Sequence, residues 1–579
     1  MGLYHMKTMA KIKGYFTFVL HSHLPWVLNH GVWPHGTSWI NEAAAETYVP
    51  ILNELYDLVD EGYTPSLTIG ITPVLSEMLA HQKFKEDFKG YLLEKLEAAR
   101  TDQDQFKSEN YKLRYKMAQF WEEWYTNIQD NFINRYGEDI PGAFKNLQDK
   151  GIIEIITCAA THGYLPLLPN DSAINAQIRT AIDSYKRIYG KNPRGIWLPE
   201  CAYRPGYNWK NPVDGNAQSS YRKGLEYYLA KNKLDYFFVD THLTMGGMAQ
   251  GVYAARFKLL KDLWKQFMDS YKPVVPHEER NPYTPYIIHS KEKIRPVSFF
   301  TRDEETGILV WSGEHGYPGD GAYLDFHKKH YPGGLRYWKV TGPKVDLGDK
   351  MEYYMDDIPK RLDENAGHYK ETIKSLLETH YEKTNQPGII TAMYDTELLG
   401  HWWFEGNWWL NRVLRWIEDD PELELTTAGK YHDKFPPSVQ VSLPEGSWGQ
   451  GGGHWIWLND WTAWSWENIT ECENKMEGIA TDHSDSNDAH LIKICNQLAR
   501  ELLLLEASDW QFLISTWSAR DYAEARLTVH YDNFNRLYDM AVKYASGENL
   551  DEGDWKFLGR LEFEDDPFPE IDFRNWAKV

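Results

Sequence analysis

Tyr394–Trp403, with the sequence Tyr-Asp-Thr-Glu-Leu-Leu-Gly-His-Trp-Trp, follows the apolar run Gly388–Met393. The apolar run predicts a buried strand, so Asp395 and Glu397 come where that strand ends. Carboxyl groups can act as acids, bases or nucleophiles on a glycosidic bond, and flat indole rings can stack on pyranose rings. The stretch therefore indicates a sugar site. The simpler alternative is purely structural: the tryptophans would be buried at the start of a helix, and the two acids would be exposed to solvent.

Short apolar strands recur along the chain and alternate with helices. Strands are predicted at 15–20, 66–70, 151–157, 194–198, 236–239, 297–300, 308–311 and 388–393, and helices at 41–60, 172–189, 220–232 and 358–383. This alternation predicts a parallel sheet that closes, or nearly closes, into a barrel of about seven strands. A barrel of this kind carries its active site at the carboxyl ends of its strands.

Side chains that can do chemistry come just after several of these strands. If the strands form one barrel, these side chains face one cleft although they lie far apart in the sequence. They are His21, His23, His162, Glu200, Asp240, His242, Asp395 and Glu397.

A chain of 579 residues is too long for one compact core. We predict a barrel domain at 10–425, with a helical insertion at 76–150, and a helical C-terminal domain at 426–579 that contributes aromatic side chains to the cleft. The region 243–296 is long and irregular, with a helix-like part at 256–271. A connection of this length is typically functional.

Composition excludes several classes of protein. The net charge of −22 argues against a surface that binds nucleic acid. The aromatic content of 15% is high and indicates that aromatic side chains do more than fill the core. Four widely spaced cysteines indicate a reducing compartment and no disulfide framework. The first apolar run is too short for a membrane span. We therefore expect a cytoplasmic enzyme with a neutral substrate.

Glu200 and Asp395 are the best candidates for a catalytic pair. Each follows an apolar strand and lies among aromatic residues, surroundings that can keep one carboxyl group protonated near neutral pH. A metal site is an alternative use of His21 and His23, with Asp240, His242 or His162 as further ligands; hydrogen bonds to substrate hydroxyls are the other. The sequence contains no P-loop, dinucleotide-binding or nucleophile-elbow motif.

Four segments resemble glycoside hydrolase family 57, and within it most closely the members that branch α-1,4-glucans. They are His21–Trp26, Trp197–Tyr203, Tyr394–Trp403 and Ala507–Leu513. The resemblance covers nearly the whole chain. It implies an incomplete TIM-type (β/α)7 barrel with a helical insertion and a helical C-terminal domain. It also implies a retaining double displacement that needs no metal and no cofactor.

The resemblance also implies roles for individual residues. Glu200 corresponds to the nucleophile and Asp395 to the general acid/base. Tyr253, on the long connection, corresponds to a loop tyrosine that we expect to fold over the site and favour transfer over hydrolysis. The remaining expected substrate-binding residues are His21, His23 and His162 at the donor subsite, Trp311, Trp448 and Trp457 at positions that contact glucan, and Trp33, Trp402 and Asp509.

The expected partner is an α-glucan such as amylose, amylopectin or glycogen, and the expected assembly is a monomer or small homo-oligomer. A family-57 α-amylase or 4-α-glucanotransferase is the main alternative, because it differs only in the acceptor. A non-catalytic glucan-binding protein would use the tryptophans alone. A metal-dependent polysaccharide hydrolase would use His21 and His23.

Overall fold

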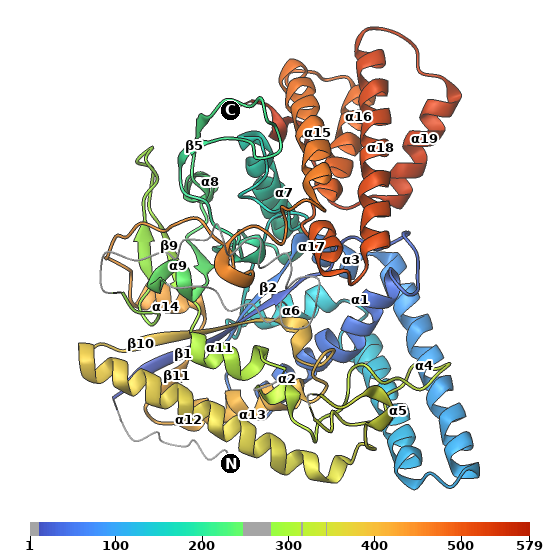
Figure 1. Cartoon of the computed structure of the whole chain (residues 1–579), viewed down its shortest axis with the longest axis vertical. Coiled ribbons are helices and arrows are strands. Elements are labelled where there is room, and N and C mark those ends of the chain that lie inside the picture. Colours follow the sequence, from blue (N-terminus) through green and yellow to red (C-terminus); the bar gives the residue numbers. More distant parts are fainter. Residues whose placement is uncertain (1–10, 247–279, 314–315, 343, 579) are drawn as a thin grey trace.

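Seven parallel strands form the centre of the molecule (Figure 1). The computed structural model describes residues 11–246, 280–313, 316–342 and 344–578. One row of strands has the order β10-β1-β2-β3 and another begins β4-β7-β9. Isolated parallel bridges, Thr157 to Ile196 and Arg302 to Thr391, join the two rows at both edges, so the ring closes. The strands are β1 (Gly14–Ser22), β2 (Thr68–Ile71), β3 (Glu154–Ile156), β4 (Gly195–Ile196), β7 (Tyr236–Val239), β9 (Val297–Thr301) and β10 (Gly388–Asp395).

Alternation along the strands separates the inside of the barrel from its outer layer. On β1, Tyr15 and Val19 belong to a small apolar cluster with Trp197, Phe238 and Met393, which fills the barrel. Phe16, Phe18 and Leu20, which alternate with them, belong to the main core that the helices cover. Both faces of these strands are therefore apolar, as expected for a parallel sheet buried on both sides. The predicted (β/α)7 barrel is confirmed.

Two of the predicted elements are wrong. Residues 308–311 are the end of helix α11 (Glu304–Trp311), whose N-cap Asp303 accepts a hydrogen bond from the Thr306 N–H. Residues 220–232 divide into a strand, β6 (Ser220–Arg222), and a short helix, α8 (Leu225–Lys231). β6 pairs antiparallel with β5 (Tyr207–Trp209).

Helices surround the barrel and form its insertion. In the insertion, α4 and α5 form a hairpin to one side of the barrel (blue in Figure 1). Phe84, Phe88, Leu92 and Leu96 are buried along α4, which places them on one face of the helix. Besides α8 and α11, the helices that the structure describes before the C-terminal bundle are α1 (Thr37–Ala43), α2 (Val49–Asp60), α3 (Pro73–Ala80), α4 (Gln82–Ser108), α5 (Lys112–Asp130), α6 (Ile140–Asp149), α7 (Asp171–Tyr189), α9 (Thr241–Met245), α12 (Ile358–Thr384), α13 (Gly406–Asp419) and α14 (Ala428–Lys434).

The C-terminal part is a helical bundle (orange to red in Figure 1). Its helices are α15 (Ala463–Asp482), α16 (Ala489–Leu505), α17 (Asp509–Thr516), α18 (Arg520–Ala545) and α19 (Glu552–Glu564). The chain stays with the barrel well past residue 425, because β11 (Leu423–Leu425) pairs with β1 and Gly446 bridges to Tyr203. We therefore propose a domain boundary between 448 and 463. In the described part of the chain, no helix combines the length and apolar character needed to cross a membrane.

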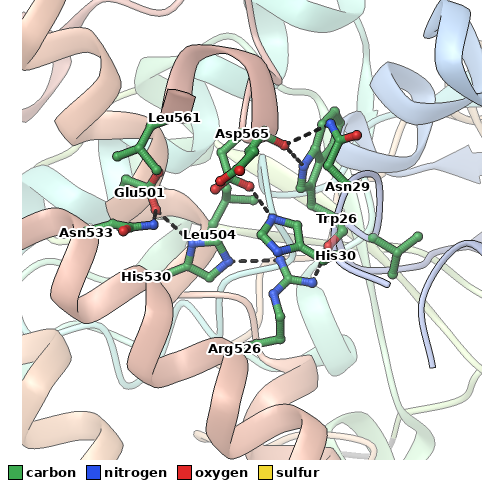
Figure 2. A network of polar contacts seen from close by, with 12 residues as sticks. Trp26, Asn29, His30, Glu501, Leu504, Arg526, His530, Asn533, Leu561 and Asp565 are labelled. Carbon is green, nitrogen blue, oxygen red and sulfur yellow. Dashed lines mark hydrogen bonds and ion pairs between the residues drawn. The ribbon is translucent and has the colours of Figure 1, made fainter. Parts of the chain in front are cut away.

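A buried polar network joins the bundle to the segment that follows β1 (Figure 2). Arg526 on α18 donates to the Trp26 carbonyl at 2.8 Å and to His530 Nε2 at 2.9 Å. His30 contacts Asp565 at 2.6 Å, and His530 Nδ1 contacts Glu501 at 2.8 Å. We call Arg526, His530, Glu501, Asp565 and His30 the α18 network. It holds the continuation of the His21–His23 segment against the bundle.

Candidate active site

The neighbouring ends of β1 and β10 bring the first site residues together. His21 lies opposite Asp395 in the parallel register of the two strands. Just beyond, Ser22 Oγ and Thr396 Oγ1 are hydrogen-bonded at 2.7 Å, and the His23 N–H donates to Glu397 at 3.2 Å. Asp395 therefore does lie at the end of a buried strand, at the rim of the barrel.

Glu200 lies in a strained turn directly after β4. Its backbone is left-handed, with φ of 60°, and so are those of Cys201 at 47° and His162 at 61°. Non-glycine residues rarely adopt this conformation, and such strain concentrates at functional sites. The Trp448 indole N–H donates to Glu200 Oε2 at 2.6 Å, and the Trp448 backbone N–H donates to the Glu200 carbonyl at 3.0 Å. The carboxyl group is thereby fixed, and the Glu200 side chain remains 17% exposed.

Three histidines line the same end of the barrel. His21 Nε2 and His162 Nε2 are 3.0 Å apart, and His162 Nδ1 is 2.8 Å from Ser508 Oγ. Burial, reinforced by neighbouring histidines, holds the pKa of both His21 and His162 well below the usual range. Both rings are therefore neutral at pH 7, and one N–H is shared between them. His162 Nδ1 also lies 4.0 Å from Glu200 Oε1.

His23 links the barrel to the C-terminal bundle. Its Nε2 is 2.9 Å from Asp509 Oδ2, and its Nδ1 is 3.0 Å from Thr72 Oγ1. Its ring also stacks on His162, with centroids 4.0 Å apart. Asp509 opens helix α17, so a residue nearly 500 positions away in the sequence completes this rim.

Both central carboxyl groups hold protons more tightly than free carboxyl groups. Burial, followed by the charges of Glu397 and Glu200, raises the pKa of Asp395 well above its usual range. Burial also raises the pKa of Glu200 to about 7, against the opposing effect of the Trp448 hydrogen bond. A protonated Asp395 beside an ionisable Glu200 is the division of roles that glycoside hydrolysis requires.

Two groups of described side chains have donor atoms close enough together for a metal ion: His23, His162 and Asp509, and His30, His530 and Asp565. In the first group, both nitrogens of His162 are already hydrogen-bonded within the protein. In the second, the Arg526 guanidinium donates to His530, so a positive charge occupies the neighbouring position. Asp240 faces Arg302 at 2.7 Å instead of joining His21 and His23.

The predicted tryptophans occupy different environments. Half-buried Trp448 and Trp311 pack edge to face, with centroids 5.7 Å apart, beside Glu200 and β10. Trp457 is 1% exposed and stacks on Tyr164, so here it supports the loop that carries Trp448. Trp402 is 37% exposed and Trp33 74% exposed. Tyr253 lies outside the described residues.

A family model described as glycosyl hydrolase family 57 matches residues 17–444, which contain the barrel strands apart from the first three residues of β1. The chain belongs to glycosyl hydrolase family 57. A second model, described as the C-terminal part of 1,4-alpha-glucan branching enzymes, matches residues 468–576.

Individual family-57 proteins are similar over the whole chain. A 1,4-alpha-glucan branching enzyme of Thermococcus kodakarensis is 40% identical over 97% of this chain and 78% of its own length. The crystal structure of a branching enzyme from Pyrococcus horikoshii has a TM-score of 0.86 and 39% identity, covering 98% of this chain and 97% of that one. An alpha-amylase from Thermotoga maritima has a TM-score of 0.79 and 30% identity, covering 98% and 99%.

Four residues of this family-57 site are absent from the prediction. Ser508 and Thr72 fix His162 and His23, and Tyr48 donates to Glu397 at 2.5 Å. Arg302 pairs with Asp240, and its charge opposes the rise in the pKa of Asp395. Arg302 directly follows strand β9. A search for charged residues just after each strand would have found it, if arginine and lysine had been considered together with acids and histidines.

Proposed function

We propose that this chain is a 1,4-α-glucan branching enzyme, which cleaves an α-1,4 bond and transfers the released chain to a C6 hydroxyl of glucan. One observation carries the proposal. Residues 468–576 match the C-terminal model of branching enzymes, and from this part Ser508 and Asp509 contact His162 and His23 at the barrel rim. The branching-type C-terminal part thus contacts the barrel rim through two histidines of the site.

In this proposal Glu200 is the nucleophile and Asp395 the general acid/base of a retaining double displacement. Asp395 gives its proton to the leaving glycosidic oxygen while Glu200 attacks the anomeric carbon, forming a glycosyl ester and releasing the shortened chain. Asp395, now ionised, takes the proton from the incoming C6 hydroxyl, whose oxygen displaces Glu200. The raised pKa of Asp395 supports its protonated starting state.

The neutral histidines are proposed to bind sugar hydroxyls at the donor position. His21 stacks on Trp197 with centroids 4.6 Å apart, and His162 is held by Ser508, so both rings are rigid. Rigid neutral donors and acceptors orient a sugar with little loss of entropy. Transfer to a glucan must also outcompete water, which requires a bound acceptor and a site that excludes solvent.

The proposal is tested by incubating linear amylose with the enzyme and recording the anomeric proton NMR spectrum. New α-1,6 signals are expected with wild-type enzyme and not with Glu200→Gln. A spectrum that loses α-1,4 signal and gains only reducing-end signal would contradict branching.

Trp448→Phe is expected to move the acidic limb of the pH–kcat/KM profile to higher pH. The Trp448 N–H bonds to the charged form of Glu200 and so lowers its pKa, which stands at about 7 with that bond in place. Without the bond the pKa rises, and less Glu200 is ionised at a given pH. Because the two carboxyl groups interact, the limb reports an apparent pKa of the pair.

The matched control for Trp448→Phe is Trp311→Phe. Trp311 packs on Trp448, but its indole N–H donates to the Met393 carbonyl at 3.1 Å. This control should leave the acidic limb in place. Equal shifts in both variants, or none in either, would show that the Trp448 hydrogen bond does not set the pKa of Glu200.

A family-57 α-amylase is the second candidate, because the amylase of Thermotoga maritima matches over the whole chain. The same carboxyl pair would then pass the chain to water. We further propose a cytoplasmic enzyme acting on amylose, amylopectin or glycogen. Its four cysteines are all free and buried, which suits a reducing compartment.

A further inference from the structure

The loop that holds Trp448 against Glu200 is closed by its own hydrogen bonds. The Ser447 N–H donates to the Gly452 carbonyl at 2.9 Å, and the Ser447 hydroxyl donates to the next carbonyl along the chain at 2.7 Å. These bonds join the two ends of residues 446–453, which we call the Trp448 loop. Because Trp448 bonds Glu200 through both its indole and its backbone N–H, the position of the carboxyl group depends on the position of this loop.

The imidazole of His242 lies against both ends of the Trp448 loop. A Cβ atom on Gly452 would lie only 2.3 Å from His242 Nε2, and a Cβ atom on Gly446 would lie 3.3 Å from the same atom. Gly452 also has a φ of 79°, which favours glycine. His242 is 4% exposed, and its Nε2 has no hydrogen-bond partner among the described residues. The ring therefore supports the loop by packing.

Asp240 fixes the orientation of the His242 ring. His242 Nδ1 lies 3.3 Å from Asp240 Oδ2, and the Arg302 guanidinium contacts Asp240 Oδ1 at 2.7 Å. Although burial opposes it, the charge of Arg302 together with the His242 contact lowers the pKa of Asp240. An ionised carboxylate only accepts hydrogen bonds, so His242 carries a proton on Nδ1 and donates it to Asp240.

Arg302 also reaches the Trp448 indole directly. Its guanidinium lies over the face of the indole, 6.0 Å from the ring centroid, which is at the outer limit of a cation–π contact. Arg302 directly follows β9 and Asp240 caps α9, so barrel elements hold both side chains. Trp448 is thus supported in two ways, by the packing of His242 against its loop and by the charge of Arg302 at its ring.

We propose that Arg302, Asp240 and His242 form a clamp that positions the Trp448 indole and, through it, the carboxyl group of Glu200. Asp240 and His242 act through other residues, so they are positioning residues and not catalytic ones. The clamp gives these two residues a role other than binding a metal. The inference rests on the proposed role of Glu200 as the nucleophile, and not on which acceptor receives the chain.

The first test observes the indole by fluorine NMR of enzyme labelled with fluorotryptophan. The resonance that disappears in Trp448→Phe is assigned to Trp448. His242→Ala, which removes the ring from the Trp448 loop, is expected to move or broaden this resonance. The matched control is Thr244→Val. The Thr244 hydroxyl is 2.8 Å from Thr301 Oγ1, so this pair links α9 to β9 as the clamp does.

Thr244→Val should leave the Trp448 resonance in place. An unchanged resonance in His242→Ala, or an equal change in the control, would overturn the proposal. This measurement requires no substrate, so it reports on the clamp even if Glu200 is not the nucleophile.

The second test is the acidic limb of the pH–kcat/KM profile for fluoride release from α-maltosyl fluoride. In His242→Ala the indole is no longer held in place and bonds the charged form of Glu200 less well. The pKa of Glu200 therefore rises, and the limb is expected to move about 1 pH unit higher. Adding Trp448→Phe to His242→Ala should move it no further than Trp448→Phe alone, because both changes act through one bond. Additive shifts, or no shift in His242→Ala, would contradict the clamp.

The other groups that act on Glu200 are the same in all of these variants. Asp509 and His23 act on it by charge, Glu200 and Asp395 interact, and His162 Nδ1 lies 4.0 Å away. Fluoride release precedes transfer to any acceptor, so a branching enzyme and an amylase give the same readout. A failure of the branching proposal is therefore distinguishable from a failure of the clamp.

Discussion

Glu200→Gln is expected to lower chain transfer by at least about 10⁴-fold, because no other group can form the glycosyl ester. Asp395→Asn is expected to lower it by about 10²–10⁴-fold, the usual contribution of a general acid/base. α-Maltosyl fluoride distinguishes the two roles, because fluoride leaves without receiving a proton. With this substrate Asp395→Asn should still release fluoride in a burst, whereas Glu200→Gln should release none.

The burst should coincide with a covalent intermediate. Asp395→Asn lacks the base that activates the acceptor, so the maltosyl ester is expected to accumulate on Glu200 and to appear by mass spectrometry of the peptide that contains it. Azide, which needs no base, should shorten its lifetime. A fluoride burst from Glu200→Gln and none from Asp395→Asn would reverse the assignment.

Arg526→Leu is expected to lower the free energy of unfolding by about 3–5 kcal/mol, the usual cost of removing one partner from a buried charged network. Arg526 is 4% exposed, and its loss leaves the Trp26 carbonyl and His530 Nε2 without their donor. The change should appear as a lower urea midpoint. Because the α18 network holds the segment that continues from His23, activity should fall at temperatures below the new unfolding transition.

Arg520→Leu is the matched control, at the start of the same helix. Arg520 pairs with Glu524 one turn along, and the two side chains are 28% and 36% exposed. Such a partly exposed pair contributes at most about 1 kcal/mol. Equal destabilisation by the two substitutions would mean that Arg526 contributes as an ordinary helix residue and not through the network.

The barrel could be predicted because its strands carry a local signal. Each strand is a short apolar run, and seven of these runs recur with helices between them. Residues 308–311 gave the wrong element because four apolar residues do not distinguish a strand from a buried helix. The capping contact of Asp303 with Thr306, outside that run, decides for a helix.

The site was only partly predictable, for a different reason. Glu200, Asp395 and the three histidines each lie at or shortly after the carboxyl end of a strand, so barrel geometry alone places them together. The residues that hold these side chains in place come from distant segments, for which barrel geometry gives no positional rule. Examples are Trp448, which bonds Glu200, and Ser508, which bonds His162. These contacts depend on how the loop that carries Trp448 and the C-terminal bundle pack on the barrel rim. Hydrophobic periodicity along the sequence gives no information about that packing.

The most direct test of branching is a count of reducing ends on linear amylose, before and after a debranching enzyme is added. Transfer to a C6 hydroxyl creates an α-1,6 bond without a net new reducing end, whereas hydrolysis creates one at each cleavage. The proposed function predicts few new ends before debranching and many after it. Equal numbers before and after would mean that water is the acceptor, and that this family-57 chain is an amylase.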